Sequence, residues 1–336
     1  MNVEGKRYRG AAALLLVLCL LCTPVFAAQD ELRLIPSGET VGIHVDASGL
    51  LVVGLTEVET SEGPRSPARE AGMRIGDFIL AIGPSEISTV QELREALSVL
   101  TGEAAVRFLR DGREMQLTIT PIVGERGDPE LGLWLRSGIS GLGTLTYVTP
   151  ESGDFGALGH GVSDSDTGLL YPLKGGSLGS GAVDTIDRGE KGKPGEAKGS
   201  LGLDAPIGRI TKNTICGIFG TLSEKPMADA EKAVEICPLN ELHCGPAFIL
   251  SDIGGSVTAY AIEISRIYPE SSGGRDMLLT ITDSALLELT GGIVQGMSGS
   301  PIIQNGCLAG AVTHVLVNDP TRGYGIGIER MLEAAA

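Results

Sequence analysis

The chain has 336 residues, a formal net charge of −16, 49 glycines and only 4 % aromatic residues. A chain of this length can bury two or three domain cores, and the scarcity of aromatic residues means that Val, Ile, Leu and Ala build them. The negative charge excludes a nucleic-acid partner and adhesion to an anionic membrane surface. The glycine content favours a turn-rich, mainly β protein.

Residues 1–28 have the features of an export segment. Lys6, Arg7 and Arg9 precede an apolar run over 11–21, and small residues suited to signal-peptidase cleavage follow at 24–28. We expect the chain to be exported across the cytoplasmic membrane. The apolar run has the length of a signal peptide rather than of a clear membrane span. Removal of the segment and its retention as a membrane anchor both stay open.

Residues 30–123 are predicted to form a small α+β domain. A helix over 90–100 has one apolar face and a capping residue at Ser88 or Thr89, and Asp111-Gly112 predicts a hairpin turn. The other predicted elements are strands at 41–45 and 50–53, a short helix that ends at Gly72, a turn at Gly76-Asp77 and a strand that reaches Ile82.

The run from Ser66-Pro67-Ala68 through Ala71-Gly72 and Gly76-Asp77 to Ile79-Leu80 resembles the PDZ domains attached to bacterial proteases. PDZ domains bind a peptide as an added strand. The resemblance implies a groove whose second wall is the helix at 90–97 and whose edge strand consists of Val41, Gly42, Ile43, His44 and Val45. A module that only braces a neighbouring domain is the alternative. On the presumed edge strand, His44 is interpreted as a solvated strand residue rather than as a peptide contact.

Residues 127–336 are predicted to form a second, β-rich domain. His160 follows a predicted strand at 145–148 and a turn, and the small residues around it leave its ring accessible. The glycine-rich stretch 174–208 is too long for an ordinary turn. It is interpreted either as an activation or self-cleavage loop or as a flexible insertion between strands.

Six cysteines divide into a pair in the export segment and four beyond it, Cys216, Cys237, Cys244 and Cys307. In an exported protein, Cys237 and Cys244 can close a short disulfide loop. A metal site from Cys237, His243 and Cys244 is disfavoured because adjacent ligands at 243 and 244 fit zinc spacing poorly. We expect no metal and no cofactor.

The most informative stretch is 291–306, which presents Ser298 in Gly296-Met297-Ser298-Gly299-Ser300-Pro301. A serine nucleophile needs a constrained turn and backbone N–H groups that converge on the oxyanion. We assign the oxyanion hole to the N–H groups of Gly296 and Ser298. Asn305-Gly306 predicts a type I′ hairpin between two strands that follow the serine.

This stretch resembles the nucleophile loop of chymotrypsin-like serine proteases, which implies a double β-barrel domain. The strand that contains His314 would then pair with the substrate backbone, and 323–328 would line the far side of the specificity pocket. The pocket floor falls on Gly292. With no charge there, we expect no preference for Lys or Arg.

The nucleophile requires a base, and His160 is our candidate because the other histidines have other assignments. Asp283, between a predicted apolar strand and a short helix, is the candidate acid. The alternatives are that Asp283 is a helix N-cap and that Asp164, Asp166 or Asp187 orients the base.

The chain as a whole resembles the stage IV sporulation protein B (SpoIVB) peptidases. The resemblance is carried by the PDZ-like domain, Gly-Ala-Leu-Gly-His160, the Ser298 stretch, Gly310–Val315 with His314, and Val317-Asn-Asp-Pro-Thr. The resemblance covers nearly everything after the export segment. It implies a catalytic triad of His160, Asp283 and Ser298. It also implies a regulatory serine endopeptidase in the intermembrane space of the forespore. That enzyme cleaves itself and then a membrane-embedded regulatory protease complex, which activates a late mother-cell sigma factor.

Two other functions stay open. The first is a general exported PDZ protease of quality control, although that class usually places its protease ahead of its PDZ domain. The second is a PDZ adaptor whose protease domain is not catalytic. Cleavage of unfolded casein would indicate the first, and peptide binding without turnover the second.

Overall fold

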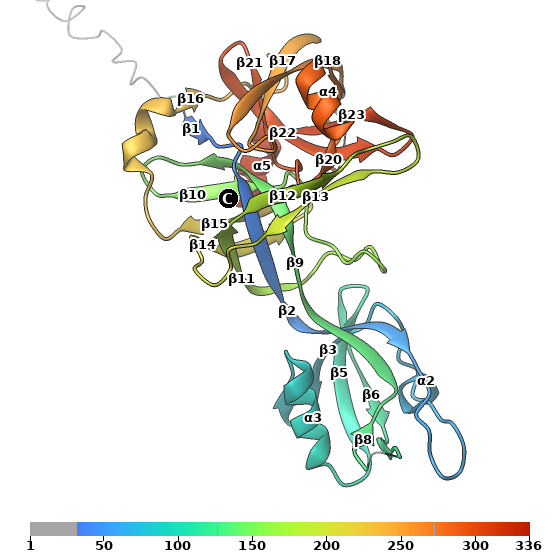
Figure 1. Ribbon diagram of the computed structural model, residues 1–336. Coiled ribbons are helices and arrows are strands. Elements are labelled where there is room, and N and C mark those ends of the chain that lie inside the picture. Colours follow the sequence, from blue (N-terminus) through green and yellow to red (C-terminus); the bar gives the residue numbers. More distant parts are fainter. Residues whose placement is uncertain (1–31, 126, 272) are drawn as a thin grey trace, which may run out of the picture. The chain divides into compact units, whose positions relative to one another are not determined.

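A computed structural model describes residues 32–125, 127–271 and 273–336 (Figure 1). The predicted export segment, 1–28, lies outside the described residues. Within the described ranges, no helix is long and apolar enough to cross a membrane. Arg33–Ala336 forms one unit, which contains two β-barrels and a smaller α+β domain.

The first barrel closes through six strands, each hydrogen-bonded to the next. Alternate residues of its first strand, such as Val41, Ile43 and Val45, enter the core because successive side chains of a strand point to opposite faces. In order around the barrel the strands are β2 (Thr40–Leu55), β9 (Leu133–Val148), β10 (Asp154–Ala157), β15 (Gly217–Leu222), β14 (Gly208–Thr214) and β11 (Leu173–Ser180). Strand β1 (Arg33–Pro36) pairs with β9 on one side and with β16 (Val234–Glu235) on the other.

The second barrel also closes through six strands, around a core that includes Ile249, Leu279 and Val312. Its strands are β17 (Gly245–Ser251), β18 (Thr258–Ile267), β19 (Met277–Ile281), β23 (Asp319–Gly327), β22 (Cys307–Leu316) and β21 (Pro301–Gln304). Helix α4 (Ser284–Thr290) follows β19, and α5 (Ile328–Ala335) ends the chain; a 3₁₀ helix, Met227–Lys232, precedes β16. The prediction of a mainly β double-barrel domain is confirmed.

The α+β domain is inserted between β2 and β9, and the outer halves of both strands belong to it. Leu50 and Leu51 of β2 pair with β3, while Leu55 pairs with Leu133 of β9. The inserted elements are α2 (Pro67–Glu70), β3 (Phe78–Ile82), β4 (Ser85–Glu86), α3 (Val90–Ser98), β5 (Ala104–Arg110), β6 (Arg113–Ile119), β7 (Ile122–Val123) and β8 (Pro129–Glu130).

The local predictions for this domain agree with its structure. Thr89 and Glu92 form a capping box at the start of α3, and the apolar face of that helix enters the domain core. Asp111 and Gly112 have positive φ and join β5 to β6.

The predicted peptide-binding edge at Val41, Gly42, Ile43, His44 and Val45 is wrong. These residues lie in the first barrel, where β9 pairs with one side of them and β11 with the other. No edge is left there for an added strand. The barrel therefore begins before the inserted domain in sequence, and the inserted domain begins within β2.

Candidate active site

Ser298 projects from a short loop between β20 (Val294–Gln295) and β21. Gly296 and Gly299 both have positive φ, at 103° and 99°, as a tight turn requires. The side chain of Met297 is fully buried in the core of the second barrel and fixes the middle of the loop. Beyond it, Asn305 and Gly306 have positive φ and join β21 to β22, which confirms the type I′ turn.

Strand β9 of the first barrel holds this loop through hydrogen bonds to its backbone. The Thr144 N–H donates to Ser298 O (2.9 Å), and the Thr144 hydroxyl donates to Gly296 O (2.8 Å). The Thr146 hydroxyl donates to Gly299 O (2.8 Å). Both threonine side chains are buried, so the position of the loop is fixed by groups that water does not compete for.

Gly299 is required by the closeness of that contact. A Cβ at this position would lie 2.1 Å from Thr144 O and 2.6 Å from the Leu158 nitrogen. Any larger residue would push the nucleophile loop away from the first barrel. Gly299 is therefore needed for the packing of the two barrels as well as for the turn.

His160 follows β10 in a turn whose residues Leu158 and Gly159 both have positive φ. Its Nδ1 lies 2.9 Å from Gly161 O. Because a carbonyl only accepts, Nδ1 carries the proton, and in the neutral ring Nε2 is free to act as a base. Burial lowers the pKa of His160 and the hydrogen bond to Gly161 opposes that shift, so the ring is neutral at pH 7.

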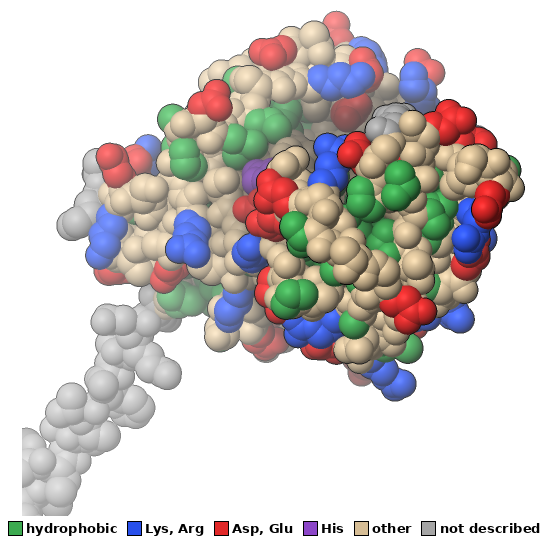
Figure 2. Space-filling model, turned by 90° about the horizontal axis from the view of Figure 1, so that it is seen from below, with side chains coloured by type: hydrophobic (Ala, Val, Ile, Leu, Met, Phe, Trp, Pro, Cys, Tyr) green, Lys and Arg blue, Asp and Glu red, His purple; other side chains and the backbone are tan. Residues whose placement is uncertain are grey.

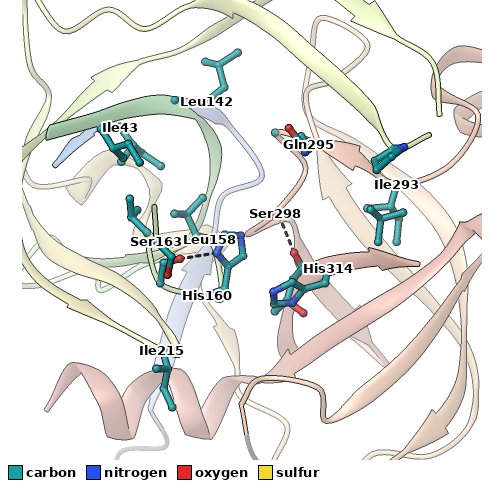
Figure 3. Close-up of a pocket in the computed structure, with 18 of the residues that line it drawn as sticks. Ile43, Leu142, Leu158, His160, Ser163, Ile215, Ile293, Gln295, Ser298 and His314 are labelled. Carbon is teal, nitrogen blue, oxygen red and sulfur yellow. Dashed lines mark hydrogen bonds between the residues drawn. The ribbon is translucent and has the colours of Figure 1, made fainter. Parts of the chain in front are cut away.

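His160 and Ser298 open into the same cavity, which has a volume of about 960 Å³ (Figure 3). The Ser298 hydroxyl donates to Thr313 O (2.8 Å). Among the described residues, none accepts a hydrogen bond from the Ser298 N–H. Of the described residues in the lining, Arg275 is the one Lys, Arg, Asp or Glu. Most of the other side chains are apolar, among them Ile43, Ile139, Leu142, Leu170, Ile215, Ile293, Val315 and Val317.

His314 belongs to this site as well. Its ring centroid lies 5.2 Å from that of His160, with 40° between the ring planes. Partial burial lowers the pKa of His314 to about 4, and the neighbouring His160 and Arg275 disfavour its charged form further. Sequence reasoning placed His314 only in the strand that pairs with substrate. Its position as a single histidine in a mostly apolar strand was the available signal.

Asp283 is not brought together with His160 and Ser298. It is the N-cap of α4: its carboxylate accepts from the Leu286 N–H (3.0 Å) and from the Ala261 N–H (3.3 Å). It does not line the cavity. The Nδ1 hydrogen bond that a triad acid would accept goes to Gly161 O instead. The catalytic role of Asp283 stays a prediction.

The rival acids are paired elsewhere. Asp164 and Asp166 both bind the guanidinium of Arg136, and Asp187 binds Lys198 at 2.7 Å. No carboxylate among the described residues lines the cavity. The face in Figure 2 carries both acidic and basic side chains.

The inserted domain has its own cavity, of about 550 Å³, between α3 and the segment 128–135. The predicted helical wall at 90–97 is therefore in place. The facing strand is the beginning of β9 rather than Val41–Val45.

The four cysteines that the structure describes form neither a disulfide nor a metal site. Cys216, Cys237, Cys244 and Cys307 are free thiols. The described part of the chain contains no group of three or more His, Cys, Asp or Glu side chains placed to hold a metal ion.

Comparisons with known proteins agree with this architecture. Residues 127–332 match the SpoIVB peptidase S55 family, and residues 60–110 match the PDZ domain family. No curated protein is significantly similar to the chain.

Two solved structures are among those with similarity to part of the chain. The PDZ domain of the SdrC-like protein from Listeria monocytogenes is 19 % identical, covering 27 % of this chain and 90 % of that one, with a TM-score of 0.22. The active form of the Rv3671c protease from M. tuberculosis is 14 % identical, covering 58 % of this chain and 73 % of that one, with a TM-score of 0.34.

The contact between Thr144 and Gly296 can be tested by removing one hydroxyl. Thr144→Val keeps the shape of the side chain but leaves the half-buried carbonyl of Gly296 without its donor, so we expect the free energy of unfolding to fall by about 1 kcal/mol. Thr144→Ser keeps the donor and should lose less. Urea denaturation measures both, and a valine variant as stable as the parent would contradict the contact.

The two roles of Asp283 are separable. Asp283→Ala removes the N-cap of α4 and should lower the free energy of unfolding by about 1 kcal/mol, whereas Asp283→Asn keeps a capping side chain and should not. Thermal unfolding measures this difference. If Asp283 is also the acid, the Asn variant will lose turnover at unchanged stability. Equal stability of the Ala variant and the parent would show that the cap contributes nothing.

Proposed function

Because the chain belongs to the SpoIVB peptidase S55 family, we propose that this serine peptidase is a regulatory enzyme of sporulation, with Ser298 as nucleophile and His160 as general base. The observation that carries the assignment is that these two side chains, from different barrels, open into one cavity while β9 holds the nucleophile loop. The protein acts on protein or peptide substrates.

In the proposed reaction Ser298 Oγ attacks the carbonyl carbon of the scissile bond and His160 Nε2 takes the hydroxyl proton. The hydroxyl must first leave Thr313 O, its partner in the structure. The N–H groups of Ser298 and Gly296 stabilise the oxyanion. As the C–N bond breaks, His160 gives the proton to the leaving amine. It then takes a proton from the water that releases the acyl group.

Gly161 O supports this role for His160, because its hydrogen bond to Nδ1 fixes the ring tautomer. The family resemblance assigns the acid to Asp283, which would have to leave its cap to reach the ring. The apolar lining of the cavity, which includes Ile293 and Val315, favours an apolar substrate side chain next to the scissile bond.

The biological role that we propose follows the family. The peptidase is exported into the forespore intermembrane space, anchored there or released, and cleaves itself ahead of or within the PDZ domain. It then cleaves a membrane-embedded regulatory protease complex that controls a late sigma factor. The cavity beside α3 would take the peptide ligand of the PDZ domain.

Activity should follow the neutral form of His160. Since burial lowers the pKa of His160, the rate of reaction with a fluorophosphonate probe should rise with pH through a midpoint below 6.5 and be flat from there to pH 8. His160→Gln should slow the reaction at pH 7 by about 100-fold or more. A midpoint above 7, or an unaffected variant, would remove His160 from the mechanism.

Self-cleavage can be tested with an inactive copy as substrate. The parent chain is incubated with tagged Ser298→Ala protein, and new N-termini are identified by mass spectrometry. We expect a few defined cuts ahead of or within the PDZ domain. Casein is the comparison substrate. Degradation of casein without defined cuts would indicate a quality-control protease, and no cleavage of either would indicate an adaptor.

A further inference from the structure

The glycine-rich stretch after β11 forms an ordered hairpin, β12 (Ala182–Asp187) and β13 (Gly195–Ser200). We call it the arm. It leaves the first barrel after β11 and returns at β14, and its far end reaches the second barrel (Figure 1). There β13 pairs in parallel with β20: Gly195 faces Val294 and Glu196 faces Gln295.

The partners of the arm are the residues immediately before Gly296. From this placement we infer that the arm positions the nucleophile loop, with Gly195 and Ala197 as positioning residues for Ser298. This inference rests on the proposed function, because it assigns a task in the catalysis by Ser298.

Packing supports the inference. Ala197 is buried in the same core cluster as Val294 and Met297. A Cβ placed on Gly296 would lie 3.0 Å from the Ala197 Cβ, so the arm lies directly against the loop. Pro194, just before β13, is part of the cavity lining.

Hydrogen bonds hold the tip of the arm, residues 188–192, at three further points. Gly189 N–H donates to Thr290 O and Gly192 N–H donates to Val317 O, each at 2.8 Å. Arg188 donates to the carbonyls of Leu287 and Glu288 at the end of α4. The arm is therefore hydrogen-bonded both to the segment that leads into the nucleophile loop and to the residue that follows β22.

Together with β9, the arm holds the loop on both sides of Gly296. Strand β9 binds the carbonyls of Gly296, Ser298 and Gly299, whereas β13 binds the preceding residues Val294 and Gln295. An oxyanion hole works only when its N–H groups are already in place before the reaction. A displacement of about 1 Å can cost about 100-fold in rate.

Gly195→Ala tests the arm. The added Cβ would lie 2.5 Å from Asp187 O and from Gly189 N, within the arm, and 2.6 Å from Val294 Cγ1, so β13 must shift both within its hairpin and against β20. The matched control is Gly175→Ala in β11, where a Cβ meets nothing within 4 Å. Arg188→Ala is a second, milder variant, since it removes an exposed side chain and leaves the core unchanged.

The readout is the reaction of each full chain with a fluorophosphonate, recorded as a rate constant and as the fraction labelled at completion. We expect the rate constant to fall at least 10-fold in Gly195→Ala and by a smaller factor in Arg188→Ala, with Gly175→Ala unchanged. Irreversible partial unfolding alone would lower the fraction labelled and leave the rate constant of the remainder as in the parent, and reversible unfolding would lower the rate constant only by the fraction folded. A Gly195→Ala variant with the parent's rate constant would overturn the inference. Absence of labelling in the parent would instead overturn the proposed function.

Discussion

The catalytic arrangement depends on the hydrogen bonds from β9 to the nucleophile loop. Thr144 and Thr146, on the first barrel, hold the carbonyls of Gly296, Ser298 and Gly299, on the second. His160 belongs to the first barrel and Ser298 to the second, so the two side chains meet only if the barrels keep a fixed position relative to each other. Hydrogen bonds from two buried threonines supply that fixed position, and the bond from Thr146 to Gly299 O is itself buried, where an unpaired carbonyl is costly.

The same strand serves the inserted PDZ domain. The outer part of β9 faces α3 across the PDZ cavity, its middle lines the catalytic cavity at Ile139 and Leu142, and its inner part binds the nucleophile loop. The PDZ domain is an insertion into the hairpin that β2 and β9 make in the barrel. A peptide beside α3 and a substrate beside Ser298 would contact one continuous strand.

Local patterns made much of this predictable. The Asn305-Gly306 turn, the capping box of α3 and the glycines around Ser298 are encoded by neighbours in sequence, and each is present. Pairing partners are not encoded locally. The alternation at Val41–Val45 is the same in a free edge strand and in a barrel strand, and only the positions of β9 and β11 decide between them. For the same reason nothing in the sequence marks Thr144, whose role depends on a contact 152 residues away.

The central claim is that Ser298 is an activated nucleophile. The most direct test locates the adduct of a fluorophosphonate on the protein without residues 1–28 by mass spectrometry, beside a Ser298→Ala control. The account predicts one adduct, on Ser298, which is absent from the control. An adduct at another residue, or none on a protein shown to be folded, would contradict it.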